Sequence, residues 1–377
     1  MPVRLLDTAI IGGGIAGASV GCFLSSAGGR VGLFEMESSL AYHTTGRSAA
    51  LLTPFYGPDS MRAFAAVASD FFYHPRFDTD KPLVTPKRVL SVVRPDDIMA
   101  AERPPHSLWW NETQVLREVP FLKRGLFAGA VVDTCVAAID VHELHSMYVR
   151  QFNANSGEIF TNAKISEIRQ TPSGVWEICA NGKIFQTPVI VNAAGAWGDE
   201  IARIASVPPV GLIPKRRTVV MLSNSDFENT DFDLMHFVIV EPDYLYFQNF
   251  GSGKLMMSPI DQTPSPPCDA QPEELDVAVT VERFEKVTTL KVKQINHTWA
   301  GLRTFSADLD PVIGFEPGVE GFFWLAGQGG YGIFSSPAIG QYAASLIGNT
   351  PLPDSFGDTG FRFESLSPER FRLTENF

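Results

Sequence analysis

The stretch that decides the fold is Gly12-Gly-Gly14-Ile-Ala-Gly17, which fits the pattern GxGxxG close to the N-terminus. The mostly apolar segment Leu5 to Ile11 precedes it and predicts a buried strand, and Ile15 to Ala27 has helical character with small residues on one face. A second apolar strand is expected at Val31 to Met36, which completes a strand–helix–strand unit. In such a unit the first glycine permits a tight turn, the second admits a pyrophosphate, and the third lets helix and strand pack closely.

The carboxylate of Glu35 adds to this pattern, because it stands at the end of the second strand. An acidic residue at this place accepts hydrogen bonds from ribose hydroxyls, and the free N–H groups of the helix N-terminus bind phosphate. A glycine-rich turn without a ligand is the alternative, and the combination of strand, helix, strand and acid disfavours it. The unit predicts a dinucleotide site that includes Gly12, Gly14, Ile15, Ala16, Gly17, Glu35 and Met36.

The composition restricts the classes of protein to which the chain can belong. Its 377 residues predict two or three domains and allow a core that needs no disulfide or metal. With 30 Lys and Arg against 42 Asp and Glu, the net charge of −12 argues against nucleic acid or an anionic membrane as the main partner. The four cysteines show no CxxC spacing, no apolar run approaches the roughly 18 to 20 residues of a membrane span, and the N-terminus does not resemble a signal peptide. We therefore expect a soluble cytoplasmic protein with free thiols.

Two later segments repeat the texture of the N-terminal unit. A strand at Val189 to Asn192 leads through glycine to a helix that opens at Trp197, and a strand at Phe322 to Ala326 precedes a helix at Ile333 to Ile347. Further expected elements are helices at Ser60 to Phe72, Val141 to Asn153 and Val277 to Leu290, a strand at Lys87 to Val93, a hairpin turn at Phe250 to Lys254 and a loop at Pro264 to Pro272.

This layout predicts an α/β fold with two domains. We expect a Rossmann-like nucleotide-binding domain built from three separated segments, residues 1–80, 135–207 and 310–377. An antiparallel-sheet substrate domain, residues 81–134 and 208–309, is inserted between them.

The length of the cofactor is indicated by two further stretches. Residues 43–50, His-Thr-Thr-Gly-Arg-Ser-Ala-Ala, follow the second strand with small and hydroxyl side chains that suit a long cofactor better than an adenosine alone. Residues 189–197 form a second strand-to-glycine crossing that can bring backbone to the same cofactor. One GxGxxG pattern predicts one dinucleotide.

Several motifs together resemble the D-amino-acid oxidase superfamily of FAD enzymes, and most closely the bacterial D-arginine dehydrogenase type of D-amino-acid dehydrogenase. These motifs are GGGIAGAS, YHTTGRSAA, VNAAGAWGDEIA, PKRR, HTWAGLRTF and GQGGYGI, and the resemblance covers nearly the whole chain. It implies non-covalent FAD, because the C-terminal region that carries the linking cysteine in sarcosine-oxidase relatives has no cysteine here. The further FAD contacts that it implies are Thr44, Thr45, Gly46, Arg47, Ser48, Ala49, Ala50, Leu51, Ile165, Ala194, Gly195, Trp197, Gly329, Gly330, Tyr331, Gly332 and Ile333.

The resemblance also implies a substrate site. Arg303 matches the arginine that binds a substrate carboxylate, for which a guanidinium fork is well suited, and Arg217 matches a second pocket arginine. Tyr246 matches a tyrosine that hydrogen-bonds the same carboxylate, and Tyr56 matches a tyrosine on a mobile segment over the pocket. Two alternatives stay open, because Arg216 could exchange roles with Arg217, and Tyr244 would share a strand face with Tyr246.

Three departures from the D-arginine dehydrogenase pattern bear on the substrate. Val89 stands where those enzymes have a glutamate, Leu51 where they have a histidine, and Phe334 where they have a polar residue. These changes remove the hydrogen-bonding partners that the guanidinium of a D-arginine substrate would need when buried. We therefore expect a substrate that is not strongly cationic. Whether the three residues line the pocket is not decided by the sequence.

The activity implied is hydride transfer from Cα to flavin N5, which gives a 2-oxo acid and ammonia after hydrolysis. The implied partners are a small amine substrate and an electron acceptor, either oxygen or a quinone. Oxidation of secondary amines, oxidation of 2-hydroxy acids, and a non-catalytic flavoprotein are the alternatives. We expect His43 to pack near the cofactor, and we expect no metal at His142 and His145, which lack a third ligand.

Overall fold

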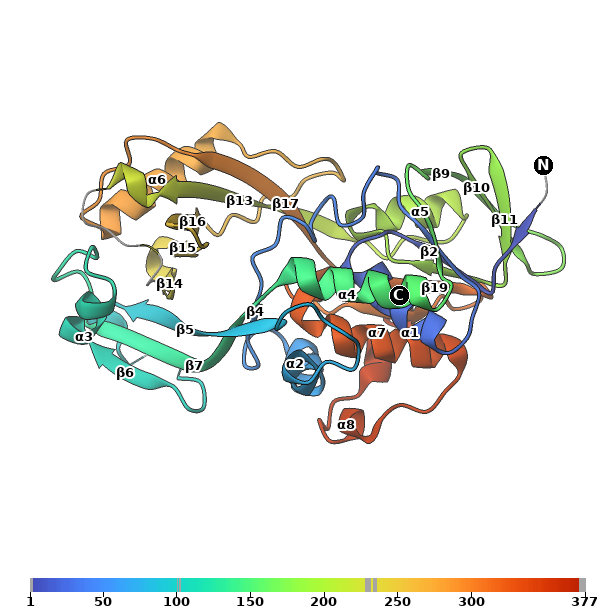
Figure 1. Ribbon diagram of the computed structural model, residues 1–377, viewed down its shortest axis with the longest axis horizontal. Coiled ribbons are helices and arrows are strands. Elements are labelled where there is room, and N and C mark those ends of the chain that lie inside the picture. Colours follow the sequence, from blue (N-terminus) through green and yellow to red (C-terminus); the bar gives the residue numbers. More distant parts are fainter. Residues whose placement is uncertain (1–2, 100, 102, 228–231, 233–235, 373–377) are drawn as a thin grey trace.

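The computed structural model describes residues 3–99, 101, 103–227, 232 and 236–372, and within them it has eight α-helices and twenty strands arranged in three sheets. Figure 1 shows two halves that lie side by side. One half carries β2, β19 and the helices α1, α4 and α7, and the other carries β5–β7, β13–β16, α3 and α6. The α/β fold with a nucleotide-binding half is confirmed.

The sheet of the first half, here called the nucleotide sheet, has the strand order β18-β19-β12-β2-β3-β8. Its strands are β2 Thr8–Ile11, β3 Val31–Phe34, β8 Glu158–Phe160, β12 Val189–Asn192, β18 Val312–Phe315 and β19 Phe322–Ala326. β2 pairs in parallel with β3 and β12, and β12 pairs in parallel with β19. The chain therefore builds this sheet from three separated segments, residues 8–34, 158–192 and 312–326.

The expected first strand is divided between two sheets. β1 Arg4–Leu5 pairs with β11 Lys183–Thr187 in a small sheet that also contains β10 Trp176–Ala180 and β9 Ile165–Gln170. The break falls at Leu6 and Asp7, where Leu6 N–H still donates to Gln186 and Asp7 N–H donates to Arg30 of the other sheet. The prediction of one strand over Leu5 to Ile11 is wrong for this reason.

The second half is built on a large curved sheet, here called the floor sheet. Its order is β20-β17-β13-β16-β15-β14-β5-β7-β4, and β6 pairs with β7 beside this path. Its strands are β4 Leu51–Leu52, β5 Val84–Val93, β6 Leu108–Asn111, β7 Gly129–Ile139, β13 Ile213–Ser223, β14 Phe237–Val240, β15 Leu245–Asn249, β16 Lys254–Ser258, β17 His297–Phe305 and β20 Gln328–Gly329. The boundary expected between residues 134 and 135 lies inside β7, and β4 and β20 join this sheet from segments assigned to the nucleotide domain.

The helices follow the expected segments closely, with one shift. They are α1 Ile15–Ser26, α2 Asp59–Tyr73, α3 Glu112–Glu118, α4 Val141–Ala154, α5 Gly198–Ile204, α6 Glu274–Val287, α7 Gly332–Gly348 and α8 Asp354–Gly357. Single 3₁₀ turns lie at Pro95–Asp97, Gly195–Trp197, Asn224–Asp226, Glu241–Asp243, Phe363–Leu366 and Pro368–Phe371. α6 begins and ends three residues before the prediction, because Thr288 bonds back to the carbonyl of Phe284 and then bridges to Leu122 in extended conformation.

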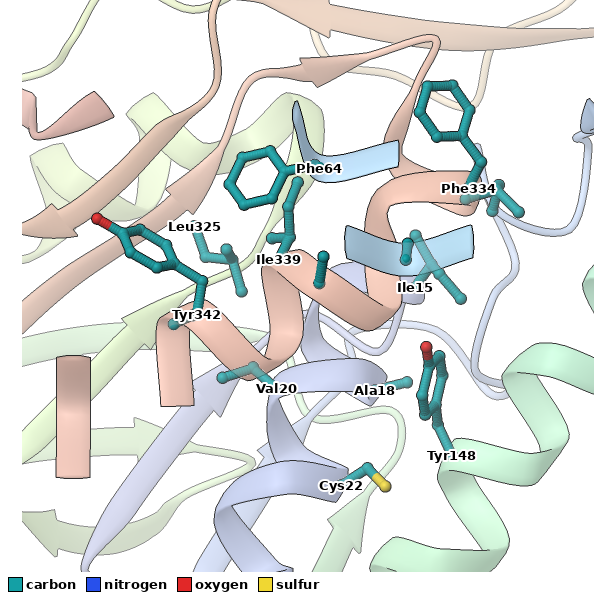
Figure 2. Packing of buried hydrophobic residues seen from close by; sticks show 14 of the residues in the cluster. Ile15, Ala18, Val20, Cys22, Phe64, Tyr148, Leu325, Phe334, Ile339 and Tyr342 are labelled. Atoms are coloured by element: carbon teal, nitrogen blue, oxygen red, sulfur yellow. The ribbon is translucent and has the colours of Figure 1, made fainter. Parts of the chain in front are cut away.

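The core of the nucleotide half lies where α1, α2, α4 and α7 cover the nucleotide sheet. In Figure 2, Ile339 and Tyr342 of α7, Phe64 of α2 and Leu325 of β19 meet in one apolar layer, and all four are buried. The close approach of α7 to α1 depends on small residues, since a Cβ at Gly340 would lie 2.8 Å from the side chain of Ser19. This packing fixes the N-terminal ends of both helices at the cavity described below.

Truncation of Ile339 to alanine is expected to lower the free energy of unfolding by about 2–5 kcal/mol, because the side chain is 2% exposed and leaves a cavity in the core. Urea denaturation measures this change. Leu346→Ala on the same helix is the matched control, since Leu346 is 36% exposed and a surface truncation changes stability by about 0.5 kcal/mol or less. Equal losses in both variants would contradict the assignment of the core-facing side of α7.

Among the described residues, no helix has the length and apolar character needed to cross a membrane.

Candidate active site

A long cavity runs from the carboxyl ends of the parallel strands in the nucleotide sheet to one face of the floor sheet. Its wall brings together residues from many separated stretches of the chain, from Ile11 to Ile333. The predicted site residues on this wall are Gly12, Gly14, Ile15, Ala16, Glu35, Met36, Thr44, Thr45, Arg47, Ser48, Ala49, Ala50, Ile165, Ala194, Gly195, Trp197, Arg217, Tyr246, Arg303, Gly329, Gly330, Gly332 and Ile333.

Two predicted contacts, Gly17 and Gly46, lie behind the wall and act through packing. A Cβ at Gly17 would lie 1.9 Å from the carbonyl oxygen of Gly12, and one at Gly46 would lie 2.3 Å from that of Ala41. Gly17 therefore allows α1 to pack closely on the turn at Gly12, and Gly46 allows its loop to pack closely on Ala41.

Tyr56 and Tyr331 stand beside the cavity and not on its described wall. Their rings are 5.7 Å apart, and Tyr56 is 61% exposed. Gly57, which follows Tyr56, has φ +98°, and a Cβ there would lie 2.9 Å from the ring of Tyr331. Burial raises the pKa of Tyr331, and the charges of Arg303 and Arg217 reach it. The pair therefore flanks the arginine end of the cavity.

The glycine-rich turn presents backbone N–H groups to the cavity. Gly12 has φ +113°, and a Cβ there would lie 2.4 Å from the carbonyl oxygen of Ala193, so only glycine suits this position. Gly14 caps α1 without a side-chain hydrogen bond, and Thr45 Oγ1 accepts from the N–H of Ile15 at 3.0 Å. The positive end of α1 thus faces the cavity.

The carboxylate of Glu35 is fixed by hydrogen bonds from backbone N–H groups, one of which belongs to the glycine-rich turn. Its Oε2 accepts from the N–H of Gly13 at 2.9 Å, and its Oε1 accepts from the N–H of Glu37 at 2.9 Å. The carboxylate is 8% exposed and lines the cavity, so its remaining acceptor positions are available to a ligand.

His145 supports the glycine-rich turn through a hydrogen bond that the sequence did not predict. His145 lies on α4, and its Nε2 donates a hydrogen bond of 3.0 Å to the carbonyl oxygen of Gly13. Burial lowers the pKa of His145, which favours the neutral ring. The sequence offers no signal for this contact, because His145 is far from the turn along the chain. No group of three or more metal-binding side chains occurs in the part of the chain that the structure describes.

Two polar atoms on the cavity wall have no hydrogen-bond partner among the described residues. They are Nδ1 of His43, whose Nε2 donates to Glu37, and Nε2 of Gln328, and both are buried. Buried polar groups normally have a hydrogen-bond partner, so these two atoms indicate that the cavity binds a polar ligand. Together with the glycine-rich turn at the start of α1 and the carboxylate of Glu35, these atoms fit a bound dinucleotide.

Substitution of Glu35 with glutamine is expected to weaken cofactor binding by roughly 10- to 100-fold, because a charged acceptor for the ribose becomes neutral. Reconstitution of the apoprotein with FAD, the cofactor that the sequence resemblance implies, measures this dissociation constant through the quenching of flavin fluorescence. Glu167→Gln, at an exposed position of β9, is the control and leaves it unchanged. An unchanged affinity in Glu35→Gln would contradict the assigned role of the carboxylate.

At the other end of the cavity, three floor strands bring Arg303, Arg217 and Tyr246 together. Arg303 on β17 is a diagonal neighbour of Arg217 on β13, because Arg217 pairs with Gly301. Burial is the main cause that lowers the pKa of Arg217, and the positive charge of Arg303 lowers this pKa further. Both guanidinium groups therefore lie within electrostatic reach of each other on one wall.

The structure distinguishes Arg217 from its neighbour. Arg216 points to the opposite face of β13, where Nη1 lies 2.8 Å from Glu273 and Nε lies 3.7 Å from Asp276. The alternation of side chains along β13 therefore places only Arg217 of this pair on the cavity wall.

Tyr244 does not share a strand face with Tyr246, so that expectation is wrong. It precedes β15 in a left-handed conformation with φ +46° and is 62% exposed, and its ring lies beside Arg283. The 3₁₀ turn Glu241–Asp243 ends there and breaks the alternation that the sequence suggested.

The three departures from the expected pocket pattern fall at two places. Leu51 and Val89 pack in one apolar cluster with Val136, Phe237 and Tyr246, and of these residues Tyr246 alone is on the described cavity wall. Phe334 lies in the core of the nucleotide half, with its ring 6.0 Å from that of Tyr331. None of the three departures is on the described wall, although two of them support the ring of Tyr246.

Comparison with family models matches residues 7–346 to DAO, described as FAD dependent oxidoreductase. The chain belongs to this family. Its cofactor is FAD, and the expected membership of the wider superfamily is confirmed, whereas the D-arginine dehydrogenase type stays a prediction.

Relatives of this DAO-family chain have several different names. Glycine oxidase of Bacillus subtilis (strain 168) is 21% identical over 368 residues, which cover 92% of this chain and 94% of the relative. Dimethylglycine dehydrogenase of Rattus norvegicus is 23% identical, over 97% of this chain and 45% of the relative. The structure of L-proline dehydrogenase from P. horikoshii has a TM-score of 0.81 at 18% identity, with 99% of each chain covered. These similarities show a shared fold and leave the substrate open.

Proposed function

We propose that this DAO-family enzyme oxidises the Cα–N bond of an amino acid, in the first place a D-amino acid, to the imino acid. The observation that supports this most is the group of Arg303, Arg217 and Tyr246 on the floor face of a cavity whose other end suits a dinucleotide. A carboxylate is the substrate group that such a set of donors recognises.

Arg303 holds the substrate carboxylate in this proposal. Within the described part of the chain its guanidinium makes no ion pair or hydrogen bond to protein, and a Cβ at Gly330 would lie 3.1 Å from its Cζ. The fork is thus free beside the glycine-rich loop, and Tyr246 offers a hydroxyl from β15. FAD, when bound, supplies the acceptor for a hydride from Cα.

The amine is expected to react in its neutral form without a dedicated side-chain base. Among the described floor-sheet residues on the cavity wall there is no carboxylate and no histidine. His43, the histidine on the wall, hydrogen-bonds Glu37 and packs 4.6 Å from the ring of Trp197, away from the arginine end. The proton of the ammonium form therefore passes to solvent before oxidation.

Oxidation of a secondary or tertiary amine is the second candidate. It is favoured by the names of several similar proteins, which include L-proline dehydrogenase, dimethylglycine dehydrogenase and iminodiacetate oxidase. The same carboxylate site would serve such substrates, because only the substituent on nitrogen differs.

Anaerobic bleaching of the visible flavin band tests the proposal. The purified yellow protein is mixed with paired D- and L-amino acids, N-methyl amino acids, cyclic amino acids and 2-hydroxy acids. Bleaching by D-amino acids supports the first candidate, and bleaching by N-substituted amines alone moves the enzyme to the second. Bleaching only by 2-hydroxy acids, or by none of these compounds, contradicts oxidation of an amine.

A further inference from the structure

The arginine end of the cavity carries more positive charge than one carboxylate needs. Arg217 and Arg303 both line it, and no aspartate, glutamate or histidine of the described floor sheet lies on this wall. One guanidinium fork satisfies both oxygens of one carboxylate, and Tyr246 adds a further donor. The second guanidinium would then be buried with part of its donors unused, which is costly.

Arg217 lines the cavity, and Asp261, which is not on the described wall, holds the Nε of its guanidinium. Its Nε donates to the carbonyl of Asp261 at 2.9 Å, while Nε lies 3.7 Å from Oδ1 of the same residue. The carboxylate of Asp261 is occupied elsewhere, since it accepts from the N–H of Thr218 at 2.8 and 3.0 Å and from its hydroxyl at 2.9 Å. Asp261 therefore orients Arg217 and only partly neutralises it.

The backbone next to Asp261 is strained in support of this arrangement. Ile260 has φ +56°, which is a rare conformation for a β-branched residue. Such strain persists where the surroundings enforce it, and here it turns both the carbonyl and the carboxylate of Asp261 toward β13. The side chain of Arg217 is buried, at 9% exposure.

We propose that the preferred substrate is a dicarboxylate amine, with one carboxylate on Arg303 and the second on Arg217. The two arginines are diagonal neighbours on adjacent strands, and such neighbours lie roughly 7–8 Å apart, with their Cβ atoms somewhat closer. Two carboxylates joined through three atoms, as in D-glutamate or iminodiacetate, suit two forks at this spacing. This inference rests on the proposed amine oxidation and names its substrate class.

A binding measurement that needs no turnover tests the second anion site. Glutarate and butyrate, which the enzyme cannot oxidise at an amine, are titrated while the visible flavin band of the holoenzyme is followed. Glutarate is expected to bind at least about 30-fold more tightly than butyrate. In Arg217→Gln this preference is expected to fall to about threefold or less, while Arg217→Lys retains part of it.

Arg216→Gln is the matched control, because it removes the same charge from the opposite face of β13, and the glutarate preference is expected to survive. Steady-state kcat/KM for D-glutamate against D-glutamine then repeats the comparison with substrates of equal size. Equal binding of glutarate and butyrate, or equal loss of both in Arg217→Gln, would overturn the inference by placing both arginines on one carboxylate. A strong glutarate preference without bleaching by any amine would support the site and contradict the proposed oxidation.

Discussion

Replacement of Arg303 with methionine is expected to lower kcat/KM for carboxylate-bearing amines by roughly 10²–10³-fold while FAD content stays unchanged. The side chain has no ion-pair or hydrogen-bond partner among the described residues, so its loss removes a substrate contact and no internal support. Loss of one partner of a desolvated charge pair costs about 2–5 kcal/mol, and each 1.4 kcal/mol is tenfold in rate or affinity. Stopped-flow reduction of the flavin, as a function of substrate concentration, measures the loss.

The variant Arg303→Lys keeps the positive charge of the side chain and removes the planar guanidinium fork. It is expected to recover less than the full rate, because an ammonium group cannot form the two parallel hydrogen bonds of a guanidinium fork. Arg216→Met, which removes an arginine from the opposite face of β13, is expected to leave the reduction rate unchanged. A normal rate in Arg303→Met would remove this residue from the proposed carboxylate site.

The variant Gly17→Ala is expected to lose FAD almost completely, with an affinity reduced by about 100-fold or more. The new Cβ would lie 1.9 Å from the carbonyl oxygen of Gly12, and backbone atoms cannot make way as a flexible side chain can. Overpacking typically costs about 1–3 kcal/mol, and here it falls on the turn that faces the cofactor. Absorbance of the purified protein at the flavin band reports the loss, and thermal unfolding reports the change in stability.

Gly357→Ala is the matched control for this substitution. Gly357 ends α8, and a Cβ there meets nothing within 4 Å. Alanine favours a helix by up to about 1 kcal/mol relative to glycine, so Tm and FAD content are expected to stay the same or rise. Retention of FAD in Gly17→Ala would show that the turn can relax, contrary to the packing described here.

The nucleotide end of the site could be predicted from the sequence because its signals are local. Gly12, Gly14 and Glu35 lie within one strand–helix–strand unit, in which spacing along the chain fixes spacing in space. The boundaries of α2, α4 and α7 agree with prediction to within one residue. α2 and α4 carry an apolar face at helical spacing, whereas α7 is apolar over most of its length and ends before a left-handed Asn349. The division of the first strand at Leu6 and Asp7 could not be predicted, because it depends on a partner at Lys183–Thr187.

The substrate end depends on tertiary arrangement to a greater degree. Arg303, Arg217 and Tyr246 lie on three different strands, and only the order of strands in the floor sheet brings them to one wall. The sequence left Arg216 and Tyr244 as competitors because it does not show which face of a strand is buried or where a turn interrupts the alternation. The orientation of Arg217 by Asp261 had no sequence signal, since it follows from a left-handed Ile260.

The position of β2 has a consequence for biosynthesis. This N-terminal strand lies in the middle of the nucleotide sheet, and the sheet is continued through β12 to β19, which ends at Ala326. At about 5–20 residues per second, a ribosome needs roughly 15–65 s to reach that residue, and until then the nascent sheet keeps an open edge, at β2 and later at β12. Nascent chains stalled before Phe322 are therefore expected to be digested by protease and to bind no flavin, whereas chains extended well beyond Gly348 gain resistance in one step.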